Sequence, residues 1–319
     1  MNKSILVLIA IFAAAGILFS LEPNTPSQSS NEVKYLAYLK QFNKPIPNDN
    51  ELFYRTSIFA EFVKKMEAHN ADPSQTYKMG INQFSDLTQK EFVTTYLGDL
   101  GESEPKTEFN KEVNAGFVAA IDWREKNVVT GVKNQGQCGS CWAFGATAVH
   151  EAYQIQYKGQ DVKTINLAEQ QLNDCSGSYG NNGCNGGLAY NALRYIAENG
   201  QTITSNYPYV ARNQNCATKD GSFRIPGVEK STGCDTLESW LQRSPIAVRV
   251  DASNWSAYRS GIFSNCVTNT NHAVFLVATN DSAWTIKNSW GPSWGESGFI
   301  RLAKGNTCNV CFGPSRPTL

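Results

Sequence analysis

The chain has 319 residues, of which 41% are hydrophobic and 18% charged, and its formal net charge at pH 7 is zero. This composition is typical of a globular protein, and the length allows two or more folding units. No run of Lys or Arg is long enough to form a binding surface for phosphates, so we expect neither nucleic acid nor a membrane surface as a partner.

Residues 1–21 have the layout of a secretory signal peptide, with Lys3 ahead of an apolar stretch at residues 5–19 and a polar segment after it. A membrane anchor is the alternative, but about 15 apolar residues fall short of the ~20 that a spanning helix needs. We therefore expect the chain to enter the secretory pathway, bound for a lysosome or vacuole or for the extracellular space. Disulfides persist in such compartments.

The next part of the chain, up to about residue 115, contains no cysteine. Apolar residues recur at helical spacing between residues 32 and 70, on either side of a turn at Pro45 and Pro47, which predicts two amphipathic helices. Alternation at residues 77–84 predicts a strand, and residues 85–88 resemble the capped start of a helix that runs to Tyr96. The polar segment 101–111 is expected to be a linker open to proteolysis.

Beyond Ile121 the pattern changes from helices to strands. Three helices are expected, at residues 141–157, 166–173 and 188–199. Four strands are then expected, at residues 246–250, 272–278, 283–288 and 298–302. Helices followed by strands predict an α+β region with two subdomains.

All nine cysteines lie at or after Cys138, so eight could pair and one must remain free. Cys141 follows glycines and opens a helix, where free backbone N–H groups and the helix dipole lower the pKa of a thiol. Cys141 is therefore the candidate nucleophile. Two other interpretations of Cys138 and Cys141 are a C-x-x-C redox pair and half of a zinc site, although no second pair of zinc ligands is evident.

A thiolate nucleophile needs a base, and the chain offers three histidines. His150 would lie about 13.5 Å along the same helix from Cys141 and half a turn away, so we expect it on the helix surface. His69 lies in the cysteine-free part and is expected to be structural. His272, at the start of an apolar strand, remains as the candidate base.

Three further residues could complete a catalytic site. The amide oxygen of Asn288 can accept a hydrogen bond from an imidazole nitrogen, and the indole of Trp290 can shield that bond from water. Gln135 could donate its amide N–H, together with the Cys141 backbone N–H, to the oxyanion of a tetrahedral intermediate.

These residues stand in motifs that resemble those of the papain-like cysteine proteases. Residues 135–144 (QGQCGSCWAF) resemble the segment of the nucleophile, residues 271–273 (NHA) and 288–295 (NSWGPSWG) those of the histidine and asparagine, and residues 184–187 (CNGG) a substrate-binding stretch. Upstream, Glu51, Arg55, Phe59 and Asn70 match a pro-helix signature of cathepsin L-like enzymes, in which Phe62 and Met66 replace the usual Asn and Ile. Gly80, Asn82, Phe84 and Asp86 match the second pro-region motif.

The resemblance implies a papain-like α+β fold with a helical left subdomain, a β-barrel-like right subdomain and an N-terminal helical propeptide. It implies a signal peptide at 1–21, an inhibitory propeptide at 22–115 that runs backwards through the cleft, and a mature peptidase domain at 116–319, with cleavage near residues 114–118. It also implies the bridges Cys138–Cys184, Cys175–Cys216 and Cys266–Cys308. Cys234 and Cys311 are then left over, and by arithmetic we expect them to form a fourth bridge.

The same resemblance implies the residues that contact substrate. They are Gly139, Asn185, Gly186, Gly187, Leu188, Ala189, Arg249, Asn271, Ala273, Trp290 and Gly313. Leu188, Ala189, Arg249, Ala273 and Gly313 would line the pocket for P2, the second residue before the scissile bond, and small residues there leave room for a bulky apolar side chain. Arg249 is unusual at its position. Its guanidinium could extend out to solvent, or it could make the pocket tolerant of an acidic side chain.

The resemblance therefore predicts a monomeric cysteine endopeptidase, made as a zymogen and activated at acidic pH, that cleaves proteins and peptides and needs no metal or organic cofactor. No insertion resembles the occluding loop of carboxydipeptidases. Two alternatives are a non-catalytic binding protein on the same scaffold, which would usually have lost one of Gln135, Cys141, His272 and Asn288, and a disulfide oxidoreductase. Asn254 and Asn280 stand in glycosylation motifs that could carry a sorting glycan.

Overall fold

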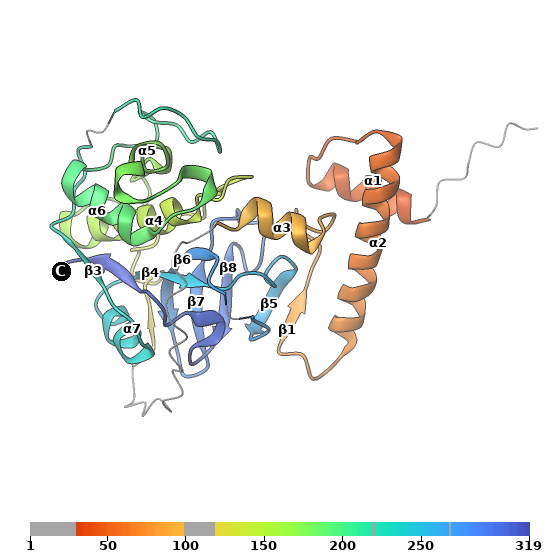
Figure 1. Ribbon diagram of the computed structural model, residues 1–319. Coiled ribbons are helices and arrows are strands. Elements are labelled where there is room, and N and C mark those ends of the chain that lie inside the picture. The colour runs from red at the N-terminus through yellow and green to blue at the C-terminus, as the bar shows by residue number, and fades with distance from the viewer. Residues whose placement is uncertain (1–29, 99–118, 219–220, 268) are drawn as a thin grey trace, which may run out of the picture.

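The computed structural model describes residues 30–98, 119–218, 221–267 and 269–319 (Figure 1). The predicted signal peptide, the polar linker at 101–111 and the expected cleavage region at 114–118 lie outside these ranges. Within them, no helix is long and apolar enough to cross a membrane.

Two helices at the N-terminal end, set apart from the rest of the molecule, form a small core of their own (Figure 1). They are α1 (Ser30–Gln41) and α2 (Asp49–Ala71), as the apolar spacing predicts. Asn48 caps α2 by accepting a hydrogen bond from the Glu51 backbone N–H. The side chains buried between the helices are those of Tyr35, Tyr38, Leu39 and Phe59. This helical pair is joined to the main body by the segment that follows it.

That segment contains β1 (Tyr77–Met79) and α3 (Gln89–Tyr96). β1 adds an antiparallel edge strand to the main sheet by pairing with β5 (Tyr258–Phe263). α3 begins with the predicted cap, because Thr88 and Glu91 form a reciprocal capping box. The predicted strand at 77–84 is too long: after Met79 the chain turns, and the Asn82 side chain accepts the Phe84 N–H.

The helical subdomain is built around α4 (Cys141–Lys158), in which every residue from Cys141 to Gln154 is buried. It is followed by α5 (Glu169–Cys175), the short 3-10 helices η1 (Gly177–Tyr179) and η2 (Gly183–Asn185), and α6 (Ala189–Asn199). α4 packs against α5 and α6 of its own subdomain and against strand β6 (His272–Thr279) of the other. Its N-terminus therefore lies where the two subdomains meet.

The second subdomain is a mixed sheet in the order β1-β5-β8-β7-β6-β4-β9-β3, with β2 paired to β6. Its remaining elements are β2 (Ile121–Asp122), β3 (Val228–Lys230), α7 (Cys234–Leu241), β4 (Ile246–Val250), β7 (Ala283–Lys287), β8 (Phe299–Ala303), the 3-10 helix η3 (Thr307–Asn309) and β9 (Ser315–Pro317). The four predicted strands correspond to β4, β6, β7 and β8. The α+β, two-subdomain fold is confirmed.

Four disulfides stabilise the two subdomains, and they join the same cysteines as the expected pairing. They are Cys138–Cys184, Cys175–Cys216, Cys234–Cys311 and Cys266–Cys308. The described residues include all nine cysteines, and Cys141 alone among them has a free thiol. The bridge from Cys138 to Cys184 is incompatible with a redox pair between Cys138 and Cys141.

Candidate active site

Cys141 is the first residue of α4, and its side chain is fully buried. Ser140, which precedes it, makes no side-chain cap, so the first N–H groups of the helix are not consumed by a capping oxygen. Backbone N–H groups of Ala273, Trp142 and Gly98 face the thiol and lower its pKa. The sulfur therefore lies next to the residue that follows His272 in β6.

His272 is held by Asn288 across the β6–β7 hairpin. Asn288 Oδ1 lies 2.7 Å from His272 Nε2 and also accepts the Ser289 backbone N–H at 2.8 Å. Because this oxygen can only accept, Nε2 must carry the proton of the neutral ring. The other nitrogen, Nδ1, is left as a proton acceptor, and it is buried with no hydrogen-bond partner among the described residues.

Trp290 covers the histidine, as its position after Asn288 predicts. Its ring centroid lies 4.7 Å from that of His272, and the indole is 1% exposed. Two aromatic side chains of the predicted propeptide (residues 22–115, called the pro-region below), Phe84 and Phe92, pack edge-on against Trp290, at 5.4 and 5.3 Å between ring centroids. The His272–Asn288 pair is thus kept away from water.

Gln135 is fixed from both ends of its amide. Its Oε1 accepts the Ser289 hydroxyl at 2.6 Å, which leaves Nε2 to donate to the carbonyl oxygens of Cys138, at 2.9 Å, and Tyr96, at 3.0 Å. Tyr96 is the last residue of α3. A carbonyl of the pro-region therefore occupies the donor that was expected to bind an oxyanion.

Sequence reasoning missed the residues that position Gln135. The Tyr209 hydroxyl donates to the Gln135 carbonyl at 2.7 Å and lies 2.7 Å from the Ser140 hydroxyl, so it links the segments on both sides of Cys138. Ser289 stands inside the motif that contains Asn288 and could have been singled out there. Tyr209 lies in an irregular segment with no motif of its own.

Burial keeps both candidate catalytic groups neutral in this state. It raises the pKa of the Cys141 thiol to about 11, against the lowering by the N–H groups around it. Burial also lowers the pKa of His272 to about 4, although the hydrogen bond to Asn288 acts in the opposite direction and raises it. The expectation of a thiol with a lowered pKa is therefore wrong while the pro-region covers the site, because desolvation outweighs the helix N-terminus.

Removal of the pro-region should make Cys141 more reactive, because the thiolate is the reactive form and hydration favours it. With a pKa of about 11, almost none of the thiol is ionised at pH 7. We expect iodoacetamide to alkylate Cys141 at least about a hundredfold faster in the processed protein at pH 7. This increase corresponds to a fall in the pKa of the thiol by about two or more units. Equal alkylation rates before and after processing would contradict the inference that the pro-region buries the Cys141 thiol.

The other two histidines are not part of this site. His150 is not on the helix surface as expected; it is fully buried and lies 2.8 Å from Gln201 Oε1 and 3.0 Å from Gln154 Nε2. Its prediction failed because α4 is surrounded by other elements, which helical periodicity alone does not reveal. His69 lies in α2, with Nε2 3.1 Å from the Tyr77 carbonyl oxygen, a structural position.

Glycines let the pro-region approach the candidate substrate-binding segment closely. A Cβ on Gly139 would lie 2.5 Å from the Cys184 carbonyl oxygen, and one on Gly98 would lie 2.9 Å from the Gly139 carbonyl oxygen and 3.2 Å from Gly186 Cα. The Gly98 N–H donates to the Asn271 carbonyl at 3.1 Å, so Gly98 contacts candidate substrate-binding residues of both subdomains.

Two other predicted members of that segment differ in their surroundings. A Cβ on Gly187 would lie 2.6 Å from Asn181 Oδ1, so this glycine is needed for the local packing of the loop. Asn185, by contrast, is exposed and could meet a substrate directly.

A pocket beside this segment, with a volume of about 270 Å³, contains four of the five residues expected to surround P2. These are Leu188, Ala189, Arg249 and Gly313; Ala273 lines a different cavity and pairs with Arg249 in the β4–β6 ladder. Arg249 does not extend into solvent, because it is 9% exposed. Its guanidinium lies 5.1 Å from the Phe312 ring centroid, and Nη2 donates to Thr270 Oγ1 at 3.2 Å.

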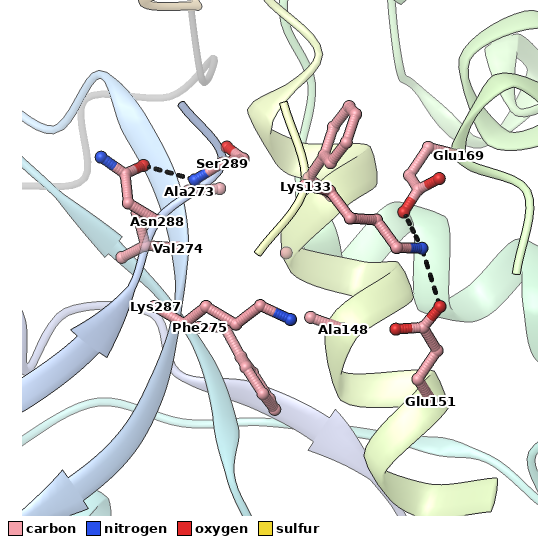
Figure 2. Close-up of a pocket in the computed structure, with 12 residues that line it drawn as sticks. Lys133, Ala148, Glu151, Glu169, Ala273, Val274, Phe275, Lys287, Asn288 and Ser289 are labelled. Carbon is pink, nitrogen blue, oxygen red and sulfur yellow. Dashed lines mark hydrogen bonds and ion pairs between the residues drawn. The ribbon is translucent and has the colours of Figure 1, made fainter. Parts of the chain in front are cut away.

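The cavity that contains Ala273 is lined by a buried group of charges behind the candidate active site (Figure 2). Lys133 lies between Glu151 and Glu169, at 2.8 and 2.6 Å from their carboxylates. From the sheet side, Lys287 donates to Thr130 Oγ1 at 3.1 Å, and Thr130 donates to Glu151 at 2.6 Å. The group connects α4 and α5 to the end of β7, directly before Asn288, so it joins the two subdomains where the site is formed.

Two family models match the chain. Residues 117–318 match the model described as papain family cysteine protease, and residues 35–92 match the cathepsin propeptide inhibitor domain. Cathepsin L 1 of Paramecium tetraurelia is 39% identical over 313 residues, covering 94% of this chain and 98% of that protein. Fruit bromelain of Ananas comosus is 35% identical, covering 98% of this chain and 93% of its own.

Solved precursors have the same architecture. A recombinant stem bromelain precursor superposes with a TM-score of 0.79 at 35% identity, covering 91% of this chain and 99% of its own. The digestive procathepsin L 3 of Tenebrio molitor larval midgut superposes with a TM-score of 0.78 at 32% identity, covering 91% of this chain and 100% of its own.

Proposed function

The chain belongs to the papain family of cysteine proteases and carries a cathepsin propeptide inhibitor domain, and on that premise we propose that Cys141 and His272 are its catalytic pair. The observation that carries the proposal is the His272–Asn288 hydrogen bond of 2.7 Å, which leaves Nδ1 as a proton acceptor in the residue before Ala273, whose backbone N–H faces the free Cys141 thiol. We assign the mature enzyme as an endopeptidase.

In the proposed reaction, His272 Nδ1 takes the proton of Cys141, and the thiolate attacks the carbonyl carbon of the scissile peptide bond. The oxyanion that forms is stabilised by the Cys141 backbone N–H and by Gln135 Nε2. His272 then gives its proton to the leaving amine, and an acyl-enzyme remains. Water, deprotonated by His272, attacks the thioester and releases the acid and the thiol.

Gly98 brings the pro-region close to the proposed catalytic thiol and to the candidate substrate-binding segment. Among the described residues of the pro-region, Gly98 directs its backbone N–H towards the Cys141 thiol, and the same N–H donates to the Asn271 carbonyl at 3.1 Å. The carbonyl that Gln135 binds belongs to Tyr96, two residues earlier. The pro-region therefore occupies one of the proposed oxyanion donors and lies against the thiol, which supports its role as an inhibitor.

The walls of the pocket assigned to P2 support a preference for bulky apolar side chains. Leu188 and Val248 contribute apolar surface, and Ala189, Ala247 and Gly313 leave space for a large side chain.

The same proposal includes the limits of the domains and the destination of the chain. The limits are 1–21 for the signal peptide, 22–115 for the propeptide and 116–319 for the mature domain, and the two family matches, at 35–92 and 117–318, support the boundary between the last two. We likewise propose entry into the secretory pathway, with a lysosomal, vacuolar or extracellular destination. The four disulfides support a compartment in which such bridges persist.

The proposed function is tested by acidifying the purified zymogen, sequencing the new N-terminus and profiling cleavage of a peptide library. We expect a new N-terminus near residues 114–118 and cleavage within peptides that carry Leu, Val or Phe at P2. Removal of residues only from peptide ends would contradict the endopeptidase assignment, and no cleavage at all would contradict the activity.

Acid activation is proposed to act inside the pro-region. Among the hydrogen bonds and ion pairs of the described residues, those between pro-region and peptidase use backbone, amide and hydroxyl groups, such as Gln83 to the Trp290 carbonyl. The carboxylates lie within the pro-region instead. Asp86 accepts the hydroxyls of Tyr35 and Tyr38, at 3.1 and 3.0 Å, and pairs with Lys44.

A second ion pair in the pro-region is too stable to acid to be the trigger. Arg55 binds Glu91 with two hydrogen bonds, of 2.8 and 2.7 Å, which lower the pKa of Glu91 to about 2. Because the pKa of Glu91 is lowered, the stability that this ion pair contributes to the folded state is fully present above the ordinary pKa of a glutamate. It is lost only as pH falls towards about 2. The pair thus persists at mildly acidic pH.

Replacing Asp86 by Asn should therefore speed activation. The amide keeps the shape of the side chain but loses the charge that holds Lys44 and the two phenols, so α1 and α2 separate from the loop before α3 more often. We expect the half-time of self-processing at a fixed acidic pH to fall about tenfold or more, the usual effect of one hydrogen bond to a charged group. Glu67→Gln, which removes one negative charge from an exposed position on α2, is the matched control. Processing of Asp86→Asn at the control rate would contradict the role of Asp86.

A further inference from the structure

The pocket assigned to P2 has an unusual distribution of charge. It is lined by two basic residues, Arg249 and Lys230, and no aspartate or glutamate is among the described residues that line it. Its remaining walls are apolar or carry hydroxyl groups, such as those of Ser231 and Thr232. A substrate side chain in this pocket would therefore lie close to the positive charges of Arg249 and Lys230.

Arg249 is built into the wall of the pocket. It lies in β4, where every residue is buried, and it pairs with Ala273, the neighbour of His272. Its guanidinium rests on the Phe312 ring, and Nη1 would lie 3.7 Å from a Cβ on Gly313. These contacts define where the charge lies, so the guanidinium is held at the pocket and not in bulk solvent.

Lys230 adds a second charge at a more exposed side of the pocket. It lies in β3, and its Nζ is 5.1 Å from the ring centroid of Tyr190, which also lines the pocket. Because Lys230 is exposed, water screens its charge more strongly than that of Arg249. Arg249 should therefore contribute the larger part of any effect.

We propose that this pocket accepts an acidic P2 side chain, so that the enzyme cleaves after Glu-X as well as after apolar-X sequences. The methylene groups of a glutamate would contact Leu188 and Val248, and its carboxylate would bind the Arg249 guanidinium, whose planar N–H groups suit a carboxylate. This inference rests on the proposed function, because P2 is defined only for a peptide that the enzyme cleaves.

The test uses three fluorogenic peptides that differ only at P2, which is Leu, Gln or Glu. Glu and Gln have nearly the same shape, so the ratio of their kcat/KM values isolates the charge. The acid-activated wild-type enzyme should favour Glu over Gln at about pH 6, where the glutamate is ionised. In Arg249→Gln this ratio should fall about ten- to hundredfold, the usual range for one hydrogen bond to a charged group. Arg243→Gln, at an exposed arginine after α7, is the matched control and should keep the wild-type ratio.

Each outcome decides the inference. A wild-type ratio of one or below, or an equal ratio in wild type and Arg249→Gln, would overturn it. If Arg249→Gln does not mature, Arg249→Lys and Lys230→Gln replace it: a reduced ratio in either supports the inference, and an unchanged ratio in both overturns it. Failure to cleave even the Leu peptide would instead overturn the proposed function, so the two failures are distinguishable.

Discussion

Replacing Cys141 by Ala should abolish peptide hydrolysis and leave the fold intact. No other cysteine can replace the nucleophile, because the remaining eight form disulfides. The substitution removes one buried sulfur atom at the start of α4 and no hydrogen-bonded side chain that another residue needs. Loss of a catalytic nucleophile costs about 10⁶-fold in kcat where it has been measured in other hydrolases, and we expect a similar loss here.

The comparison should be made after mixing the Cys141→Ala zymogen with a trace of active wild-type enzyme, so that the variant is processed in trans. The processed variant should elute as a folded protein, with the circular dichroism spectrum of the wild type, and should still bind substrate peptide. Ser140→Ala, which alters the neighbouring hydroxyl that lies 2.7 Å from the Tyr209 hydroxyl, should keep substantial activity. Residual turnover of Cys141→Ala that exceeds the small contribution of the added wild-type enzyme would remove Cys141 from its role.

Replacing Glu151 by Ala should cause a large loss in the free energy of unfolding. Its carboxylate accepts Lys133 Nζ, the Thr130 hydroxyl and the Leu167 N–H, at 2.8, 2.6 and 2.9 Å. Removing it leaves Lys133 and Lys287 in the interior with Glu169 as the remaining acid of the group. Breaking a buried ion pair from one side costs about 3–5 kcal/mol of the free energy of unfolding.

In a domain of this size such a loss corresponds to a fall in Tm of about 6–20 °C. The measurement is best made in the Cys141→Ala background, where self-digestion cannot interfere, at one fixed scan rate. Glu125→Ala, an exposed position, is the control and should change stability by less than about 0.5 kcal/mol. A Tm for Glu151→Ala within about 2 °C of the control would contradict a stabilising role for the charge group, since about 1 kcal/mol gives that shift.

The pH dependence of this difference follows from the direction of the shift in pKa. Lys133 and Lys287 hold the pKa of Glu151 below its ordinary value despite burial. A lowered pKa contributes stability that is fully present above the ordinary pKa of a glutamate, about 4.3, and is lost as pH falls through the lowered value. The part of the Tm difference that comes from the Glu151 charge should therefore be fully present at pH 7 and shrink in strong acid. Burial and the Glu151 charge raise the pKa of Glu169, so protonation of Glu169 adds a second pH dependence at less acidic pH.

The candidate catalytic residues could be found in the sequence because each has a local signal. Cys141 follows glycines at the start of a helix, His272 begins an apolar strand, and Asn288 directly follows the next strand of the same hairpin. Once the hairpin is expected, the His–Asn pair follows from the geometry of antiparallel strands. The Thr88 cap of α3 was predictable for the same reason, because a capping box is a pattern of neighbouring residues.

The features that the sequence did not reveal depend on contacts between distant segments. The burial of His150 requires knowing that α4 is covered on every side, and the inward position of Arg249 requires Phe312 beside it. The buried charges of Lys133, Glu151, Glu169 and Lys287 are far apart in the sequence and meet only where the two subdomains pack.

The raised pKa of Cys141 likewise could not be read from its motif. It reflects burial of the thiol beneath Gly98 and its neighbours, which is a property of the chain with its pro-region in place. The motif alone contains only the helix N-terminus, whose effect on the pKa has the opposite sign.

The measurement that tests the central assignment most directly is active-site labelling of the acid-activated enzyme with a peptidyl epoxide, followed by peptide mapping. The assigned roles predict one adduct per molecule, on the peptide that contains Cys141, and loss of hydrolysis in proportion to labelling. They also predict that the zymogen at neutral pH is labelled far more slowly. Complete labelling of Cys141 with hydrolysis undiminished would contradict its role as the nucleophile.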